Sequence, residues 1–247
     1  MNVSRTCYIA WLLVLLLGHS SDERNYTPAK THKEAHGTIG TEQAAETVQL
    51  AALRDIYLTA ESMPKGDLLE GITVTSGDRS RQFDWATVTN PIYSPRLYAV
   101  DLNADANDEI IVILTIGTGT GVLEEDIHVL DAMLNEILVE DPVAWIEQQT
   151  TNKIISSDNQ ISVQLDVQGT RVENVYNRSD AGSWNEALGF GSIVKYDVKG
   201  QQITARVSAQ ASPTVFVGDL EVTYTSSGFV LRCGLIQFAD FDEERNG

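Results

Sequence analysis

The sequence predicts an α+β fold that is mainly β, with antiparallel sheets, an N-terminal helix and one short inserted helix. Three observations support this prediction. Short runs rich in Val, Ile, Thr and Tyr recur between polar turns after residue 70, as is typical of strands. Two segments in the final third contain glycine turns between apolar runs. Only two segments carry the spacing or the cap of a helix.

The N-terminus predicts export. Arg5 precedes the apolar run "CYIAWLLVLLLG" (7–18), and polar "HSSDERN" follows it, which is the pattern of a signal peptide over 1–20. The alternative is an uncleaved anchor, but the run is shorter than the about 20 apolar residues of a membrane span. The polar segment 21–40 has no apolar period and predicts a flexible linker. We therefore expect a secreted or envelope-associated protein without a membrane span in its mature form.

The segment 41–60 has the spacing of a helix. Thr41 suits the cap, and Pro64 and Gly66 follow the end of the segment. Small or apolar residues recur at steps of three and four along one face: Ala45, Val48, Ala52, Ile56 and Ala60. This stripe predicts core packing.

The remainder predicts strands, with one helix between them. The expected strands include "GITVTS", "QFDWATVT", "RLYAV", "EIIVILT", "DIHVLD" and "NEILVE". Asp141 before Pro142 predicts a capped helix over "VAWIEQQ". Hairpin turns are expected at 199–200 and 226–228. Residues 41–247 therefore form either one β-rich domain or two lobes divided near 141–152.

Composition excludes some functions. The formal net charge is -18 and the isoelectric point is about 4.4, so the surface repels nucleic acid and is compatible with a cation or a basic partner. Cys7 lies in the signal region, which leaves Cys233 alone. A disulfide framework and a cysteine zinc cluster are therefore excluded, and we expect Cys233 to be a small buried residue.

The stretch "DLNADANDEIIVILT" (101–115) places four acidic side chains within nine residues, directly before an apolar strand. Oxygen ligands at alternate loop positions suit calcium, which needs six to eight oxygens at about 2.3–2.6 Å. The predicted ligands are the side chains of Asp101, Asn103, Asp105 and Glu109 and the backbone oxygen of Asn107. Without an ion the carboxylates would repel one another. A solvated acidic turn without calcium is the alternative.

This loop resembles the calcium loops of FG-GAP and VCBS-type repeats, D-x-[DN]-x-D-G-x-x-[DE] followed by an apolar strand. The resemblance covers 101–113 and implies a calcium site. The sequence departs from the pattern at Ala106, where the family has glycine, and alanine at a positive φ costs about 1 kcal/mol. A single copy occurs, so no propeller is predicted. An EF-hand fits less well, because position twelve is Val112.

A longer span, from Leu97 to Asp131, resembles uncharacterised exported proteins of Gram-positive, spore-forming bacteria. This resemblance implies secretion and a β fold, and it implies no particular reaction.

Two further motifs are candidates for a phosphate loop and for a metal or catalytic site. The glycine-rich "TIGTGTGV" (115–122) lacks the lysine of a phosphate loop and predicts a hairpin connection. Asp126 and His128 share a strand face in "LEEDIHVLD", where they could bind a metal or act as acid and base. The residues favour a non-enzymatic binding or envelope-associated module with a calcium-stabilised loop. The alternative, a secreted carboxylate-dependent hydrolase, requires Asp126, His128 and the loop acids to meet in one cleft.

Overall fold

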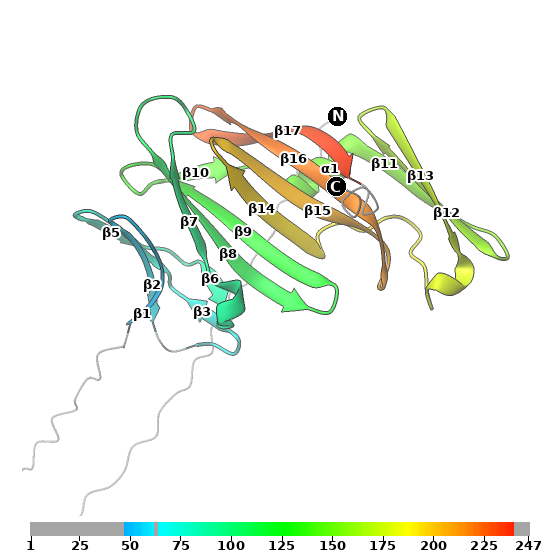
Figure 1. Cartoon of the computed structure of the whole chain (residues 1–247), viewed down its shortest axis with the longest axis horizontal. Coiled ribbons are helices and arrows are strands. Elements are labelled where there is room, and N and C mark those ends of the chain that lie inside the picture. The colour runs from blue at the N-terminus through cyan, green and yellow to red at the C-terminus, as the bar shows by residue number, and fades with distance from the viewer. Residues whose placement is uncertain (1–46, 62–63, 240–247) are drawn as a thin grey trace, which may run out of the picture. The chain divides into compact units, whose positions relative to one another are not determined.

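The computed structural model describes residues 47–61 and 64–239, which belong to one compact unit spanning 44–247. The predicted signal peptide, the predicted linker and the end of the chain after residue 239 lie outside the described residues. The described part is mainly β, and its sheets are largely antiparallel (Figure 1).

Two small sheets come first along the chain. The four-stranded sheet has the order β1 (Thr47–Leu53), β2 (Ile56–Glu61), β4 (Thr73–Ser76) and β5 (Arg79–Gln82). A two-stranded sheet pairs β3 (Leu68–Glu70) with β6 (Ala86–Val88), and a 3₁₀ turn, η1 (Pro91–Tyr93), follows.

The helix predicted for 41–60 is wrong over the residues that the structure describes. Thr47–Glu61 forms the antiparallel hairpin of β1 and β2, and 41–46 lie outside the described residues. Within β2 the spacing misled because Ile56 and Ala60, four residues apart, also fit an alternation of two. The predicted core packing is wrong for Val48 and Ala52, which are exposed in β1. Ile56, Leu58 and Ala60 are indeed buried on one face of β2.

The largest sheet has eight strands. Their order is β10 (Glu136–Val139), β17 (Val230–Ala239), β16 (Val215–Ser227), β15 (Gln202–Ser212), β14 (Ile193–Lys199), β9 (Val122–Leu130), β8 (Glu109–Gly119) and β7 (Arg96–Val100). β9 pairs with β8 along one edge. Along its other edge it pairs first with β14 and then with β10. β10 also pairs with β17. Six strands therefore close into a hydrogen-bonded ring, in the order β9, β14, β15, β16, β17 and β10, and β10 pairs back to β9.

The remaining elements follow β10 in the chain. The predicted helix is confirmed as α1 (Pro142–Gln149), and the Asp141 side chain caps it by accepting from Val143 N and Ala144 N. A three-stranded antiparallel sheet follows, with β11 (Thr150–Ser156), β12 (Gln160–Val167) and β13 (Thr170–Asn177), and then the 3₁₀ turn η2 (Arg178–Asp180). No helix among the described residues is long and apolar enough to cross a bilayer.

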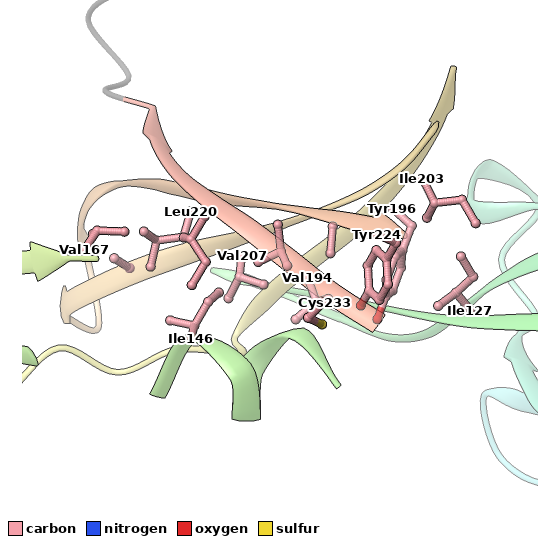
Figure 2. Close-up of a cluster of buried hydrophobic side chains, with 14 of the residues drawn as sticks. Ile127, Ile146, Val167, Val194, Tyr196, Ile203, Val207, Leu220, Tyr224 and Cys233 are labelled. Atoms are coloured by element: carbon pink, nitrogen blue, oxygen red, sulfur yellow. The ribbon is translucent and has the colours of Figure 1, made fainter. Parts of the chain in front are cut away.

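Two hydrophobic clusters form the core, and β8 contributes to both. Ile111 and Ile113 face the larger cluster, which contains residues from α1, β9, β12 and β14–β17. Figure 2 shows part of this cluster, with Ile146 of α1 beneath Val207 and Leu220. Ile110, Val112 and Leu114 face the smaller cluster, which contains residues of β2 and β4. A strand covered on both faces needs a continuous apolar run, as "IIVIL" provides.

Cys233 is buried in the larger cluster, as predicted. Burial raises the pKa of its thiol to about 11, and the nearby acids Glu140 and Asp141 act in the same direction. Such a thiol is poorly nucleophilic at neutral pH.

Candidate calcium-binding loop and its surroundings

The segment 101–108 connects β7 to β8, and its side chains turn back on the loop's own backbone. The Asp101 carboxylate accepts from Asp105 N at 3.2 Å and from Ala106 N at 3.0 Å. Asn103 Oδ1 accepts from Asp105 N at 2.9 Å. These bonds hold the side-chain oxygens of Asp101 and Asn103 against the backbone of one tight loop.

Asn103 lies between two carboxylates of this loop. Its side-chain amide donates to Glu109 Oε1 at 2.8 Å and to Asp105 Oδ2 at 3.1 Å. The positive end of the amide dipole thus occupies the place between two acidic groups. A cation bound there would replace this weak dipole with a full charge.

Glu109 is the buried member of the loop, with a relative exposure of 4%. Its Oε2 accepts from Leu102 N at 2.7 Å, which connects the first residue of β8 to the start of the loop. Burial raises the pKa of Glu109, and the charges of Asp105 and Asp101 raise it further. A nearby cation would favour the ionised form of this carboxylate.

Asp105 and Asn107 form the tip of the loop. The backbone N–H and the side-chain amide of Asn107 both donate to Asp105 Oδ1, at 2.8 and 3.1 Å. The N–H bond is the main reason that the pKa of Asp105 is lowered. Asp108 points away from the other acids and pairs with Arg54 at 3.0 Å.

The backbone of the loop is left-handed at two alanines. Ala104 has φ 62° and Ala106 has φ 71°. Ala106 occupies the position where the calcium-loop pattern has glycine. Ala106 therefore has a positive φ, which glycine adopts readily, and it carries the steric cost of a Cβ there.

The side chains of the loop do not by themselves make a complete metal site. Among the described residues, no three His, Cys, Asp or Glu side chains gather closely enough to hold a metal ion by themselves. A calcium site here would accordingly require the amide oxygen of Asn103, and water or backbone oxygens would have to complete it. Gln201 also contacts the loop, because its amide donates to Asp101 O at 2.9 Å.

The second predicted candidate, the pair Asp126 and His128 on β9, lies elsewhere. His128 Nε2 is 3.4 Å from Asp126 Oδ2, and Nδ1 is 3.5 Å from Glu136 Oε1. The imidazole stacks on Trp85 with 3.9 Å between the ring centroids, and Trp85 in turn stacks on Phe83 at 4.0 Å. His128 therefore helps to pack β9 against residues next to the four-stranded sheet.

Asp126 is also held by its surroundings. Its Oδ1 accepts from Ile127 N at 2.9 Å. Burial, the largest single influence, acts to raise the pKa of Asp126, but the hydrogen bond and charge of His128, together with the hydrogen bond from Ile127 N, outweigh it and the net shift is downward.

A cavity of about 650 Å³ lies where β9 separates from β14, and five acidic residues contribute to its lining: Glu124, Glu125, Asp126, Glu140 and Asp141. Most of these carboxylates have structural partners. Asp141 caps α1, and Glu140 accepts from Cys233 N and pairs with Arg232. No residue of the loop 101–109 lines this cavity or the one beside His128.

A third cavity, of about 310 Å³, was not predicted from the sequence. It is lined by residues of β7, β9 and β14–β16 and of the β14–β15 turn region: Arg96, Glu125, Lys195, Tyr196, Asp197, Lys199, Gln202, Thr204, Arg206 and Glu221. The alternation of charged and apolar residues in "VKYDVK" fits a strand with one polar face. That pattern carries no information about which other strands lie beside this face.

Comparison with known proteins adds no relative. No family model, curated protein or solved structure matches the chain.

Proposed function

We propose that the protein is an exported β-rich binding or envelope-associated module whose loop at 101–109 is stabilised by calcium. The observation that carries the proposal is the gathering of Asp101, Asn103, Asp105 and Glu109 around one small region of the loop. The positive φ at Ala106 and the raised pKa of Glu109 also support it. Calcium would neutralise a cluster that otherwise stores repulsion at the start of a buried strand.

The geometry favours a binding module over a carboxylate-dependent hydrolase. A hydrolase of that kind requires two carboxyl groups placed across one cleft and free to act on a substrate. Asp126 and His128 contact one another, but the loop acids lie outside the cavities that these two residues line. The acids Glu125 and Glu140 already hold backbone N–H groups and arginines.

The experiment is a calcium titration by calorimetry, together with thermal melts of the purified full-length chain. Extracellular modules bind calcium with dissociation constants of about 10⁻⁴–10⁻³ M, and about 10 mM calcium is therefore a sufficient test concentration. Binding to the native state alone stabilises it by RT ln(1 + [L]/Kd). We expect about 1–3 kcal/mol and a rise of a few degrees in melting temperature.

Asp105→Ala should abolish this rise, because it removes a carboxylate from the centre of the loop. The matched control is Asp158→Ala, which removes an exposed carboxylate at the turn between β11 and β12 and should leave the rise intact. Magnesium should have little effect, since it demands a tighter octahedral shell. A wild-type melt that does not move at about 10 mM calcium would leave only the solvated acidic turn.

A further inference from the structure

Strand β13 forms an open edge of the three-stranded sheet (Figure 1). It pairs with β12 on one side, and no other described strand pairs with it. An edge strand with a row of unpaired N–H and C=O groups is a template for the addition of another strand. Proline and bulges often protect such edges, but β13 contains no proline and its register with β12 has no bulge.

The hydrogen-bond pattern of the sheet shows which backbone groups of β13 face outward. Just after β13, Arg178 N donates to Asn159 O at 2.9 Å, which continues the ladder between β12 and β13. Hydrogen-bonded pairs alternate along an antiparallel ladder, so every second residue counted back from this pair bonds to β12. The N–H and C=O groups of the residues between them, Arg171, Glu173 and Val175, therefore point away from β12. None of these groups has a hydrogen-bond partner among the described residues.

The opposite edge of the same sheet has more contacts with the rest of the chain. β11 begins at the end of α1, where Thr150 N donates to Ile146 O. Further along β11, Asn152 Oδ1 accepts from Leu188 N at 2.7 Å. The edge that remains available to a further strand is therefore that of β13.

The exposed face of β13 carries one charge of each sign. Arg171 is exposed and makes no hydrogen bond or ion pair with another described side chain. Glu173 is held in place, because its Oε1 accepts from Ser162 Oγ at 2.9 Å and from Gln164 Nε2 at 3.2 Å. These bonds leave Oε2 of Glu173 for a further donor.

These two charges are complementary to those of a second copy of the same strand. When two β13 strands pair antiparallel around Val172, Arg171 of each copy lies directly opposite Glu173 of the other. Opposite charges at such positions stabilise a sheet, and the apolar Val172 lies opposite its own counterpart. A pairing centred on Glu173 would instead place two carboxylates opposite each other, which is destabilising.

We propose that the protein forms a symmetric dimer through β13, in which two three-stranded sheets join into one continuous sheet. The outward backbone groups of Arg171 and Glu173 would form about four hydrogen bonds between the copies. A two-fold interface uses the same surface on both copies, so association ends at the dimer. The formal charge of -18 on each chain opposes association, and the pairing is short. The dimer is therefore weak and depends on concentration.

The test is sedimentation velocity of the full-length protein over a series of concentrations. About 0.15 M salt limits the repulsion between the copies, because the Debye length is then about 8 Å. We expect a reversible equilibrium between monomer and dimer. Glu173→Arg should weaken the dimer by about tenfold or more, because Arg171 of one copy then faces an arginine of the other.

The double variant Arg171→Glu/Glu173→Arg should restore the dimer, since each charge again faces its opposite. The matched control is Lys153→Glu, which reverses an exposed charge on β11 of the same sheet and should leave the equilibrium unchanged. Circular dichroism would establish that each variant is folded. Association through any other part of the chain would not respond to these substitutions in this way.

Oxidative crosslinking tests the register directly. Val172 and its counterpart form a non-hydrogen-bonded pair with Cα atoms about 4.5 Å apart, a separation that a disulfide can span. Val172→Cys should therefore give a covalent dimer under mild oxidation. Asn174→Cys, at a half-buried position on the same face of β13, should not, because each cysteine would lie opposite Thr170. Cys233 is buried and is unchanged in both variants.

A protein that stays monomeric at every concentration would overturn the proposal. A dimer that Glu173→Arg does not weaken, or that the folded double variant does not restore, would overturn it as well. Crosslinking in Asn174→Cys but not in Val172→Cys would contradict the pairing around Val172. A dimer with the expected response to all three charge variants, crosslinked in Val172→Cys, would support it.

Discussion

In β8 all seven residues from Glu109 to Thr115 are buried, whereas none of the eight residues just before them is buried. The strand is held by apolar contacts on both faces. The loop is held by hydrogen bonds among its own carboxylates, amides and backbone. Apolar burial depends weakly on pH and ions, while a cluster of carboxylates depends on both. The two neighbouring segments should accordingly be destabilised under different conditions.

The largest effect should come from the strand. Ile111 has a relative exposure of 0% in the larger cluster, and replacement by alanine removes buried methyl groups and leaves a cavity. Ile111→Ala should lower the free energy of unfolding by about 3–4 kcal/mol, with or without calcium. Urea denaturation would measure it.

The control for this variant is Ile116→Ala on the same strand, where the side chain is 37% exposed. That change should cost within about 0.5–1 kcal/mol. A loss for Ile111→Ala that calcium restores would show that the strand and the loop are not held separately.

A smaller effect of opposite sign should come from the loop. Ala106 has φ 71°, and Ala106→Gly relieves the clash of its Cβ with the backbone. This variant should raise the free energy of unfolding by up to about 1 kcal/mol. Ala99→Gly in β7 is the matched control. It lies in a strand at a negative φ, and it should instead lower stability by about 0.5–1 kcal/mol.

Stabilisation by Ala106→Gly should be measurable by urea denaturation with and without calcium. If glycine at 106 destabilises the protein as glycine at 99 does, the left-handed backbone of the loop is not a source of strain.

The smallest effect should be one of pH. Burial first, and the charges of Asp105 and Asp101 next, raise the pKa of Glu109 above its ordinary value of 4.5. The folded protein therefore binds this proton more readily than the unfolded chain. Without calcium, Glu109 favours folding below its ordinary pKa, and this contribution is lost as the pH rises through the pKa of the folded state.

Calcium requires the ionised form of Glu109, so protons compete with it. The rise in melting temperature that calcium causes should become smaller as the pH falls through the raised pKa of Glu109. This loss should begin at a higher pH than it would for a glutamate with an ordinary pKa. Thermal melts at several pH values would measure this. Glu109→Gln should bind calcium more weakly and lose this part of the pH dependence; an unchanged profile in that variant would assign it to another group.

The sequence alone determined those features that depend on residues close together in the chain. The buried strand after the acidic loop follows from its apolar run, and α1 follows from Asp141 and Pro142, because a cap acts on backbone groups two or three residues away. The hairpin turns near Gly200 and Gly228 follow from the positive φ that glycine permits. The gathering of Asp101, Asn103, Asp105 and Glu109 was predictable for the same reason, since all four lie within one loop.

Tertiary structure decided the remainder. Ile56 and Ala60 fit steps of two as well as a step of four, and only the pairing of β1 with β2 selects the strand. The charged cavity joins Arg96 to residues about a hundred positions later, and His128 meets Trp85 from a distant part of the chain. These contacts depend on which strands become neighbours in the closed ring, and neighbours are selected by the burial of the whole apolar surface, which no local pattern encodes.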